Sequence, residues 1–119
     1  AKISEESVFK IWGSGEPLRE FLYVEDLAKA ILFIVEKNIE TDLINIGSSE
    51  EVSIKELGFL LKEIIDYKGK IEFDTSKPDG NPRKLLDSSI INSHGWESTI
   101  NLEEGLIRTY SWYKENILD

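Results

Sequence analysis

The sequence predicts a mixed α/β fold with about three short strands and four helices in the order β-α-β-α-β-α-α. Short β-branched or aromatic runs that stop at a glycine or a turn are typical of strands. Between them lie longer segments whose apolar residues recur every three or four positions, which is the period of an amphipathic helix. No repeat, low-complexity tract or linker interrupts the 119 residues. A chain of this length is expected to form one domain around one core.

The first half of the chain is expected to contain two strands and the helix between them. Val8–Trp12 is β-branched and aromatic and stops at a glycine, which favours a strand. A helix should begin near Val24, with Glu25 and Asp26 in its first turn, where the helix dipole favours anions. The brief apolar run at residues 43–46 precedes a Gly-Ser-Ser turn and is typical of a buried strand. The apolar face of the helix would comprise Val24, Leu27, Ala28, Ile31, Ile34 and Val35.

A second helix and a third strand are expected next. Ser53 and Glu56 form the sequence pattern of a capping box, which predicts a helix that ends near Gly69. A strand should occupy residues 71–73, and the two prolines and the glycine of residues 76–82 predict an irregular loop. The apolar face of this helix would comprise Ile54, Leu57, Leu60, Leu61, Ile64 and Ile65.

Two further helices are expected to complete the chain. Asp87 is placed to cap a short helix that runs through Asn92 and that Gly95 closes. Asn101 and Glu104 form the capping pair of the last helix. The apolar side of that helix would comprise Leu102, Leu106, Tyr110, Tyr113 and Ile117.

Composition excludes several classes of function. Without cysteine the chain has no disulfide, thiolate metal site or cysteine nucleophile, and its single histidine, His94, argues against any metal site and for a surface or capping role. The net charge of −9 disfavours nucleic acid as a partner, whereas a small phosphorylated ligand needs only a few local cations. No apolar run approaches the roughly 18 residues of a membrane helix, and no secretory signal is apparent. A cytoplasmic protein without a membrane partner is therefore expected.

Two short motifs suggest chemistry but fit a structural role better. The Gly-Ser-Gly run at residues 13–15 opens like a dinucleotide fingerprint, yet Leu18 stands where a third glycine is needed. Pro17 also lacks the N–H that a phosphate would use, so a tight turn after a strand is expected. Tyr110 and Lys114 have the Tyr-x-x-x-Lys spacing of short-chain dehydrogenases. Because no fingerprint precedes them and Tyr110 lies on an apolar stripe, core packing is the expectation.

Cations on two separate segments are the best candidates for ligand binding. Arg19 follows a Gly-Pro turn, where its planar guanidinium can form two parallel hydrogen bonds to a phosphate. Arg83 and Lys84 follow a proline-rich loop, which limits the ordering cost of presenting them to a ligand. Together the two segments could clamp a diphosphate. Trp12, at a strand end beside a glycine, suits a sugar or a base, but a core aromatic is an equal alternative.

The chain resembles the C-terminal part of the GDP-L-fucose synthases, which are extended short-chain dehydrogenases. The resemblance runs from about Val8 to the end of the chain, over residues 12–28, 44–47, 73–87 and 95–96. The elements REFLYVEDLA (19–28) and NIG (45–47) are shared by many extended nucleotide-sugar enzymes. The run KPDGNPRKLLD (77–87) is much more specific and selects the fucose synthase branch. The departure is Asn81, where the family usually has a small hydroxyl residue.

This resemblance implies a role for the chain and for four of its residues. Trp12, Arg19 and Lys84 match positions near the GDP-sugar, and Arg83 is adjacent. Residues 1–119 would form a C-terminal substrate-binding fragment that lacks the Rossmann core. The NADP-binding domain and the groups for epimerisation and hydride transfer would lie upstream, so no catalytic or cofactor-binding residue is expected here. The parent enzyme would be a homodimer, and the fragment alone would be inactive and would expose apolar surface.

Two alternatives remain open. One is the equivalent segment of another extended short-chain enzyme that acts on UDP- or dTDP-sugars, which would share Arg19 and the Asn-Ile-Gly element. The Pro-Arg-Lys run at residues 82–84 argues against it. The other is a non-catalytic binding module, which the abrupt start without a methionine disfavours.

Overall fold

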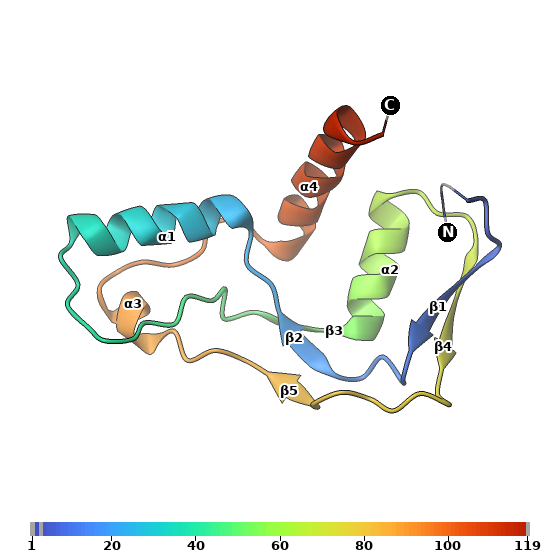
Figure 1. The fold of residues 1–119 in the computed structure, drawn as a ribbon, viewed down its shortest axis with the longest axis horizontal. Coiled ribbons are helices and arrows are strands. Elements are labelled where there is room, and N and C mark those ends of the chain that lie inside the picture. Colours follow the sequence, from blue (N-terminus) through green and yellow to red (C-terminus); the bar gives the residue numbers. More distant parts are fainter. Residues whose placement is uncertain (1, 3, 119) are drawn as a thin grey trace.

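Two small sheets organise the molecule, a computed structural model that describes residue 2 and residues 4–118. In the first sheet, β1 (Val8–Trp12) pairs in parallel with β4 (Lys70–Asp74). The second sheet has the order β3-β2-β5, in which β2 (Leu18–Glu20) is antiparallel to β3 (Glu51–Ser53) and parallel to β5 (Arg83–Lys84). The described residues thus contain five strands rather than the predicted three, as Figure 1 shows.

Four helices are found in the described part of the chain, in the predicted order. They are α1 (Val24–Glu36), α2 (Ile54–Ile64), α3 (Ser89–Ser93) and α4 (Leu102–Asn116). In Figure 1, α1 and α3 lie at one end of the molecule, α2 lies beside β1 and β4 at the other end, and α4 rises between them. The mixed α/β class is therefore confirmed.

The predicted helix caps are confirmed with one correction. The Ser53 hydroxyl accepts the Glu56 N–H at 3.1 Å while the Glu56 carboxylate accepts the Ser53 N–H at 2.9 Å, which completes the capping box of α2. The Asn101 side chain likewise accepts the Glu104 N–H at 2.9 Å. However, α2 ends at Ile64 rather than near Gly69, because Asp66 takes the left-handed conformation with φ of 53°.

The shorter α3 also ends as predicted. Its N-cap is Ser88 rather than the predicted Asp87, and the Asp87 carboxylate accepts the Ser89 N–H at 3.0 Å just inside the helix. The C-cap of α3 is the exposed His94, whose Nδ1 lies 2.8 Å from the Ile90 carbonyl oxygen. Gly95 follows it with φ of 96°. A capping role for His94 is therefore confirmed.

The strand predicted at residues 43–46 is wrong. Ile44 and Ile46 pack against the core, so the apolar pattern does report burial. A strand also needs a hydrogen-bonded neighbour, and no described strand pairs with this segment. The neighbouring strand of the sheet is instead β3, which lies five residues further along the chain.

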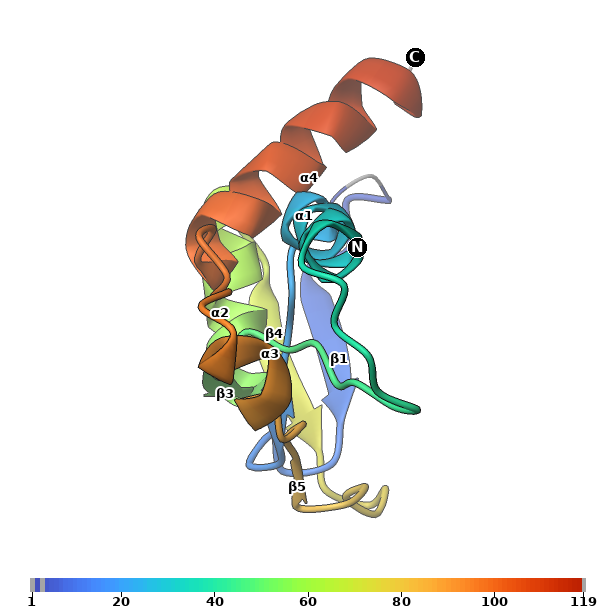
Figure 2. The ribbon, with the colours of Figure 1, turned by 90° about the vertical axis from the view of Figure 1, so that its left-hand side faces the viewer.

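The hydrophobic core is much smaller than one domain of this length would bury. Its buried members are Ala30, Ile91 and Trp96, with Leu22, Phe33, Ile34, Ile44 and Ile46 packed around them. The radius of gyration is 17.1 Å, whereas a compact domain of this length has about 13.5 Å. Figure 2 shows how thin the molecule is, in keeping with its extents of 51 × 36 × 18 Å. The described residues therefore bury only a small core, and the expectation of one domain stays a prediction.

Most of the predicted apolar face of α1 lies in solvent. Val24 and Val35 are each 67% exposed and Ile31 is 52% exposed. The helix is covered instead along the side that carries Ala30 and Phe33, and Ile34 is the member of the predicted face that packs there. Because α1 has two apolar sides, periodicity predicted the helix correctly but could not tell which side the rest of the chain covers.

Candidate functional site

The segments that carry the predicted ligand-binding residues lie side by side. The turn at residues 13–15 follows β1, and the loop at residues 76–82 follows β4. Backbone bonds join the two segments: the Gly13 N–H donates to the Asp74 carbonyl at 2.9 Å, and the Leu18 N–H donates to the Pro82 carbonyl at 2.8 Å. Two stretches about 65 residues apart in the sequence therefore form one surface.

An anion does occupy the 13–15 turn, but it is a side chain of the same molecule. The carboxylate of Asp79 accepts the Ser14 N–H at 2.7 Å and the Ser14 hydroxyl at 2.6 Å. The hydroxyl bond, followed by the backbone bond, lowers the pKa of Asp79 from its ordinary value. Gly13 and Gly15 have φ of 87° and 81°, which confirms the tight turn. The turn does not fit the phosphate of a dinucleotide, because Asp79 already takes this N–H.

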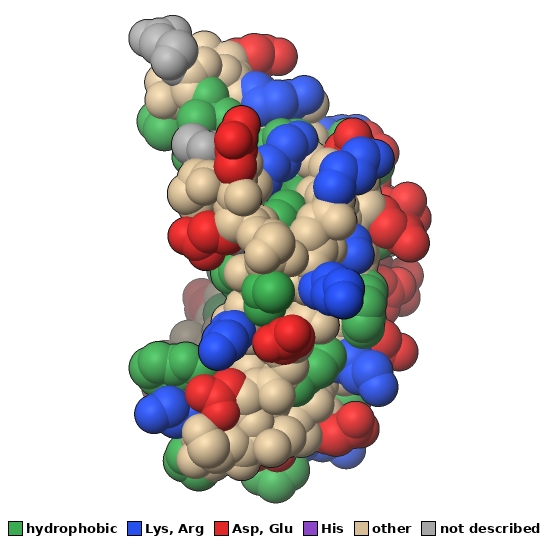
Figure 3. Space-filling model, turned by 90° about the vertical axis from the view of Figure 1, so that its right-hand side faces the viewer, with side chains coloured by type: hydrophobic (Ala, Val, Ile, Leu, Met, Phe, Trp, Pro, Cys, Tyr) green, Lys and Arg blue, Asp and Glu red, His purple; other side chains and the backbone are tan. Residues whose placement is uncertain are grey.

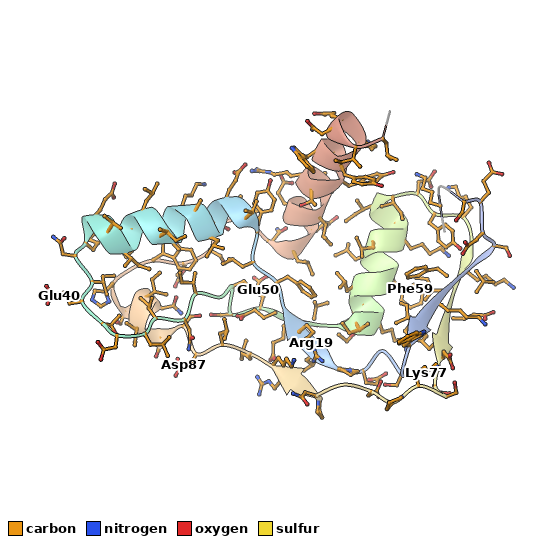
Figure 4. All side chains as sticks on the ribbon, in the orientation of Figure 1. Arg19, Glu40, Glu50, Phe59, Lys77 and Asp87 are labelled. Carbon is orange, nitrogen blue, oxygen red and sulfur yellow. The ribbon has the colours of Figure 1, made fainter. Side chains whose placement is uncertain are left out.

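Arg19 keeps most of its hydrogen-bonding capacity. It lies half-buried in the middle strand β2, beside β5, as Figure 4 shows. Its Nη1 donates to the carbonyls of Leu18 at 2.6 Å and Asn81 at 2.8 Å. A guanidinium has five N–H donors, and Nε and Nη2 find no acceptor among the described residues, so three donors remain.

Lys84 and Arg83 point to opposite sides of the second sheet. Arg19 and Lys84 are register partners on neighbouring parallel strands, and Leu18 and Arg83 form the next pair. Because side chains alternate between the two faces of a strand, Arg19 and Lys84 share one face, and Arg83 lies on the other. The exposed Lys84 has no ion-pair or hydrogen-bond partner among the described residues.

Arg83 is engaged in a bidentate ion pair. Its Nε and Nη2 donate to the carboxylate of Glu51 at 2.7 and 2.6 Å, across the middle strand from β5 to β3. The hydrogen bond to Arg83 lowers the pKa of Glu51, whose side chain is only 17% exposed. This geometry favours a role for Arg83 in joining strands over the predicted contact with a ligand.

Trp12 is a surface residue, so the alternative of a core aromatic is wrong. It is 73% exposed at the end of β1. The ammonium of Lys77 lies 5.5 Å from the centre of its ring, a distance at which a cation and an aromatic face attract. Figure 4 shows Lys77 where the 76–82 loop leaves β4. Sequence reasoning did not single out Lys77, although it opens the KPDG run.

Glu20, the last residue of the middle strand β2, links this strand to two neighbouring segments. The carboxylate of Glu20 accepts the Ser49 N–H at 2.7 Å and the Leu86 N–H at 3.4 Å. It also lies against Gly47, where an added Cβ would come within 2.5 Å of it. The glycine of the Asn-Ile-Gly element is therefore needed for close approach of this carboxylate.

Asp26 ties the start of α1 to the segment before α4. The carboxylate is fully buried and accepts the Thr99 N–H at 3.0 Å, the Thr99 hydroxyl at 2.9 Å and the Ile100 N–H at 2.8 Å. Burial is the largest single influence and acts to raise the pKa of Asp26. The hydrogen bonds from Ile100 and Thr99, together with the charge of Lys29, act in the other direction and outweigh it, so the net result is a lowered pKa.

Tyr110 was predicted to pack in the core, and this prediction is wrong. It is half-buried on α4, where Lys2 donates to its hydroxyl at 3.3 Å and the Lys114 ammonium lies 4.9 Å from its ring centre.

In the described range no group of three or more acidic or histidine side chains is arranged to hold a metal ion. None of the described helices is both long and apolar enough to span a bilayer.

The candidate residues line an open surface. A hollow of about 490 Å³ lies elsewhere and is bounded by Glu16, Ser53, Lys55, Glu56, Phe59, Leu60 and Glu63. On the face that Figure 3 shows, positive and negative side chains are interspersed with hydrophobic ones.

Comparison with known proteins shows that the chain is similar to one part of longer nucleotide-sugar enzymes. The model of the NAD dependent epimerase/dehydratase family matches residues 1–47. The chain is 49% identical, over 99% of its length, to "Probable GDP-L-fucose synthase 1" of Oryza sativa subsp. japonica, of which it spans 36%. The chain thus spans about a third of the length of such relatives.

Solved structures share the fold. A GDP-L-fucose synthetase from Naegleria fowleri bound to NADP is 30% identical with a TM-score of 0.79, over 92% of this chain and 35% of that one. The UDP-glucose 4-epimerase of Thermotoga maritima with UDP-glucose is 29% identical with a TM-score of 0.81, over 98% of this chain and 37% of that one. The resemblance to the GDP-L-fucose synthases is thereby confirmed along nearly the whole chain, which is homologous to about a third of such a protein.

Proposed function

We propose that this chain is the GDP-sugar-binding portion of a GDP-L-fucose synthase. Such an enzyme converts GDP-4-keto-6-deoxymannose to GDP-L-fucose by 3,5-epimerisation and NADPH-dependent reduction. The observation that carries the proposal is the register of the second sheet, in which Arg19 and Lys84 are neighbours on one face. An otherwise acidic chain thereby presents two cations without carboxylate partners at one place.

Each ligand-binding residue has a distinct task in this proposal. The three remaining N–H groups of Arg19 donate to phosphate oxygens, and Lys84 adds a point charge beside them. The exposed ring of Trp12 packs on the sugar or the base. Lys77, held over that ring, supplies a third cation. Arg83 is left out because its Nε and Nη2 already donate to the Glu51 carboxylate, which offsets its charge.

Catalysis and cofactor binding belong to an upstream domain in this proposal. The glycine turn of this chain does not fit a dinucleotide phosphate, because Asp79 occupies it, so NADPH would bind to the upstream domain. The exposed apolar stripe of α1 (Val24, Leu27, Ile31 and Val35) supports a partner domain, because monomeric proteins rarely leave such a surface uncovered. The fragment alone is expected to be inactive, and dimerisation of the parent enzyme stays a prediction.

The fold is equally compatible with the alternative that the chain belongs to an enzyme acting on another nucleotide-sugar. The chain shares its architecture with a UDP-glucose 4-epimerase at least as fully as with a GDP-L-fucose synthetase, so the fold does not indicate which base is bound. The KPDGNPRK run and the higher identity to a GDP-L-fucose synthase favour GDP. A non-catalytic module would bind a nucleotide-sugar without turning it over.

Calorimetry on the full-length protein that contains this chain tests the proposal. GDP and GDP-sugars should bind more tightly than UDP or dTDP. Arg19→Ala and Lys84→Ala should each weaken GDP binding roughly ten- to hundredfold, because each removes a charge-assisted contact with phosphate. Arg108→Ala is the matched control, since Arg108 is exposed on α4 and pairs with Glu104. Equal affinity of wild type and Arg19→Ala for GDP would refute the assigned site, and preference for UDP would favour the alternative.

A further inference from the structure

The contact between Asp79 and Ser14 joins the two segments of the proposed site by side chains. Both carboxylate oxygens of Asp79 are used by a single residue, Ser14, which is 65 positions away in the sequence. Asp79 is otherwise exposed, in the middle of a loop without regular structure. A bond of this length and multiplicity between two loops restrains how they lie relative to each other.

The 13–15 turn is shaped to receive this carboxylate. Gly13 is buried, has φ of 87°, and would place an added Cβ within 2.2 Å of the Asp79 Oδ1. Any side chain at Gly13 would therefore displace Asp79. The fit is independent of the hydrogen bonds, because it concerns the space beside the turn rather than its donors.

The rest of the 76–82 loop carries this restraint toward the cations. Two residues after Asp79, the Asn81 carbonyl accepts a bond from Arg19, and the Pro82 carbonyl then accepts the Leu18 N–H. The chain continues directly into β5, where Lys84 pairs with Arg19. Prolines on either side of Asp79, at positions 78 and 82, restrict the conformations through which the loop could rearrange.

We propose that Asp79 is a positioning residue, which holds the 76–82 loop on the 13–15 turn and thereby fixes Arg19 and Lys84 relative to each other. Asp79 also accepts the Ser14 N–H, which a phosphate could otherwise use. The diphosphate is therefore directed to Arg19 and Lys84. This inference rests on the proposed function and adds a residue that does not touch the ligand.

Steady-state kinetics of the full-length enzyme with its GDP-sugar test the inference. Asp79→Ala should raise KM about tenfold and leave kcat within twofold, because the groups that carry out the reaction are untouched. Asp79→Asn should restore most of the affinity, since an amide can accept the Ser14 N–H and donate to its hydroxyl. Ser76→Ala is the matched control: it removes a hydroxyl bond to Asp74 in the same loop without contacting the turn.

A readout without substrate separates this inference from the proposed function. Amide hydrogen exchange at Ser14 should accelerate about tenfold in Asp79→Ala and stay unchanged in Ser76→Ala. If wild type fails to bind any GDP-sugar, the proposed function is wrong, whatever the exchange result. If wild type binds but KM is equal in wild type and Asp79→Ala, or Ser76→Ala raises KM as much, the positioning role is overturned. Unchanged exchange at Ser14 would overturn the contact itself.

Discussion

Replacement of Asp26 by alanine should release the start of α1 from the segment before α4. Asp26 is fully buried, and its carboxylate accepts three hydrogen bonds, two from backbone N–H groups and one from a hydroxyl. Asp26→Ala leaves all three donors, on the exposed Thr99 and the half-buried Ile100, without a partner at a position that is buried in wild type. Buried donors without partners are costly, so the effect should exceed that of an ordinary surface substitution.

The size of the effect follows from the number of bonds. A hydrogen bond to a charged group contributes about 1.5–3 kcal/mol. Three bonds at the lower end sum to about 4.5 kcal/mol, and bonds that share one carboxylate are not strictly additive. We expect a loss of about 3–5 kcal/mol in the free energy of unfolding. Amide exchange at Thr99 and Ile100 should accelerate roughly ten- to hundredfold.

Denaturant unfolding and amide exchange on the full-length protein measure both quantities. Asp87→Ala is the matched control, because its exposed carboxylate also accepts one N–H at a helix start and should cost only about 1 kcal/mol. Equal losses in the two variants, or unchanged exchange at Thr99 and Ile100, would refute this reasoning.

The pH dependence of this contribution has a definite sign. The pKa of Asp26 is lower in the folded chain than in the unfolded one. Its contribution is therefore complete above the unfolded pKa of about 3.9 and is lost as the pH falls through the folded value. Asp26→Asn should accordingly differ most from wild type near neutral pH and least in strong acid.

Two further substitutions test the bracing of β2 and the exposed side of α1. Gly47→Ala should lower the free energy of unfolding by about 1.5–3 kcal/mol, because its Cβ displaces the Glu20 carboxylate from the Ser49 N–H. In a Glu20→Ala background denaturant unfolding should show a smaller loss, and an equal loss contradicts the explanation. Ile31→Lys should lower the melting temperature of the full-length protein by several degrees if the upstream domain covers this stripe, whereas Glu36→Lys on the polar side should not. Equal melting temperatures for the two variants would argue against that domain contact.

Features set by neighbouring residues could be predicted from the sequence. The capping box of α2 depends on Ser53 and Glu56, which are three positions apart, and the cap of α4 depends on Asn101 and Glu104. Their hydrogen bonds form within a single turn of chain, so the pattern of residue types is sufficient. The positive φ after α3 could be predicted for the same reason, because Gly95 directly follows the last cap.

Features set by distant residues could not be predicted in this way. β2 and β5 are three and two residues long and largely charged, so they have no apolar alternation, and they exist because they pair with each other. The run at residues 43–46 has the apolar pattern but lacks a neighbouring strand. The contact of Asp79 with the turn is also distant, and its only local signal is Gly13, whose missing side chain makes room for a carboxylate.

The middle strand β2 shows why this site depends on polar contacts more than on a core. Leu18 and Arg19 pair with both neighbouring strands, Arg19 shares one face of the sheet with Lys84, and the Glu20 carboxylate accepts the Ser49 N–H. None of the three is fully buried, and the buried cluster lies in another part of the chain. Water competes with exposed hydrogen bonds, so the bonds around β2 are weaker here than they would be beneath a covering domain. The positions of Arg19 and Lys84 should therefore become fully fixed only when an upstream domain excludes water from this surface.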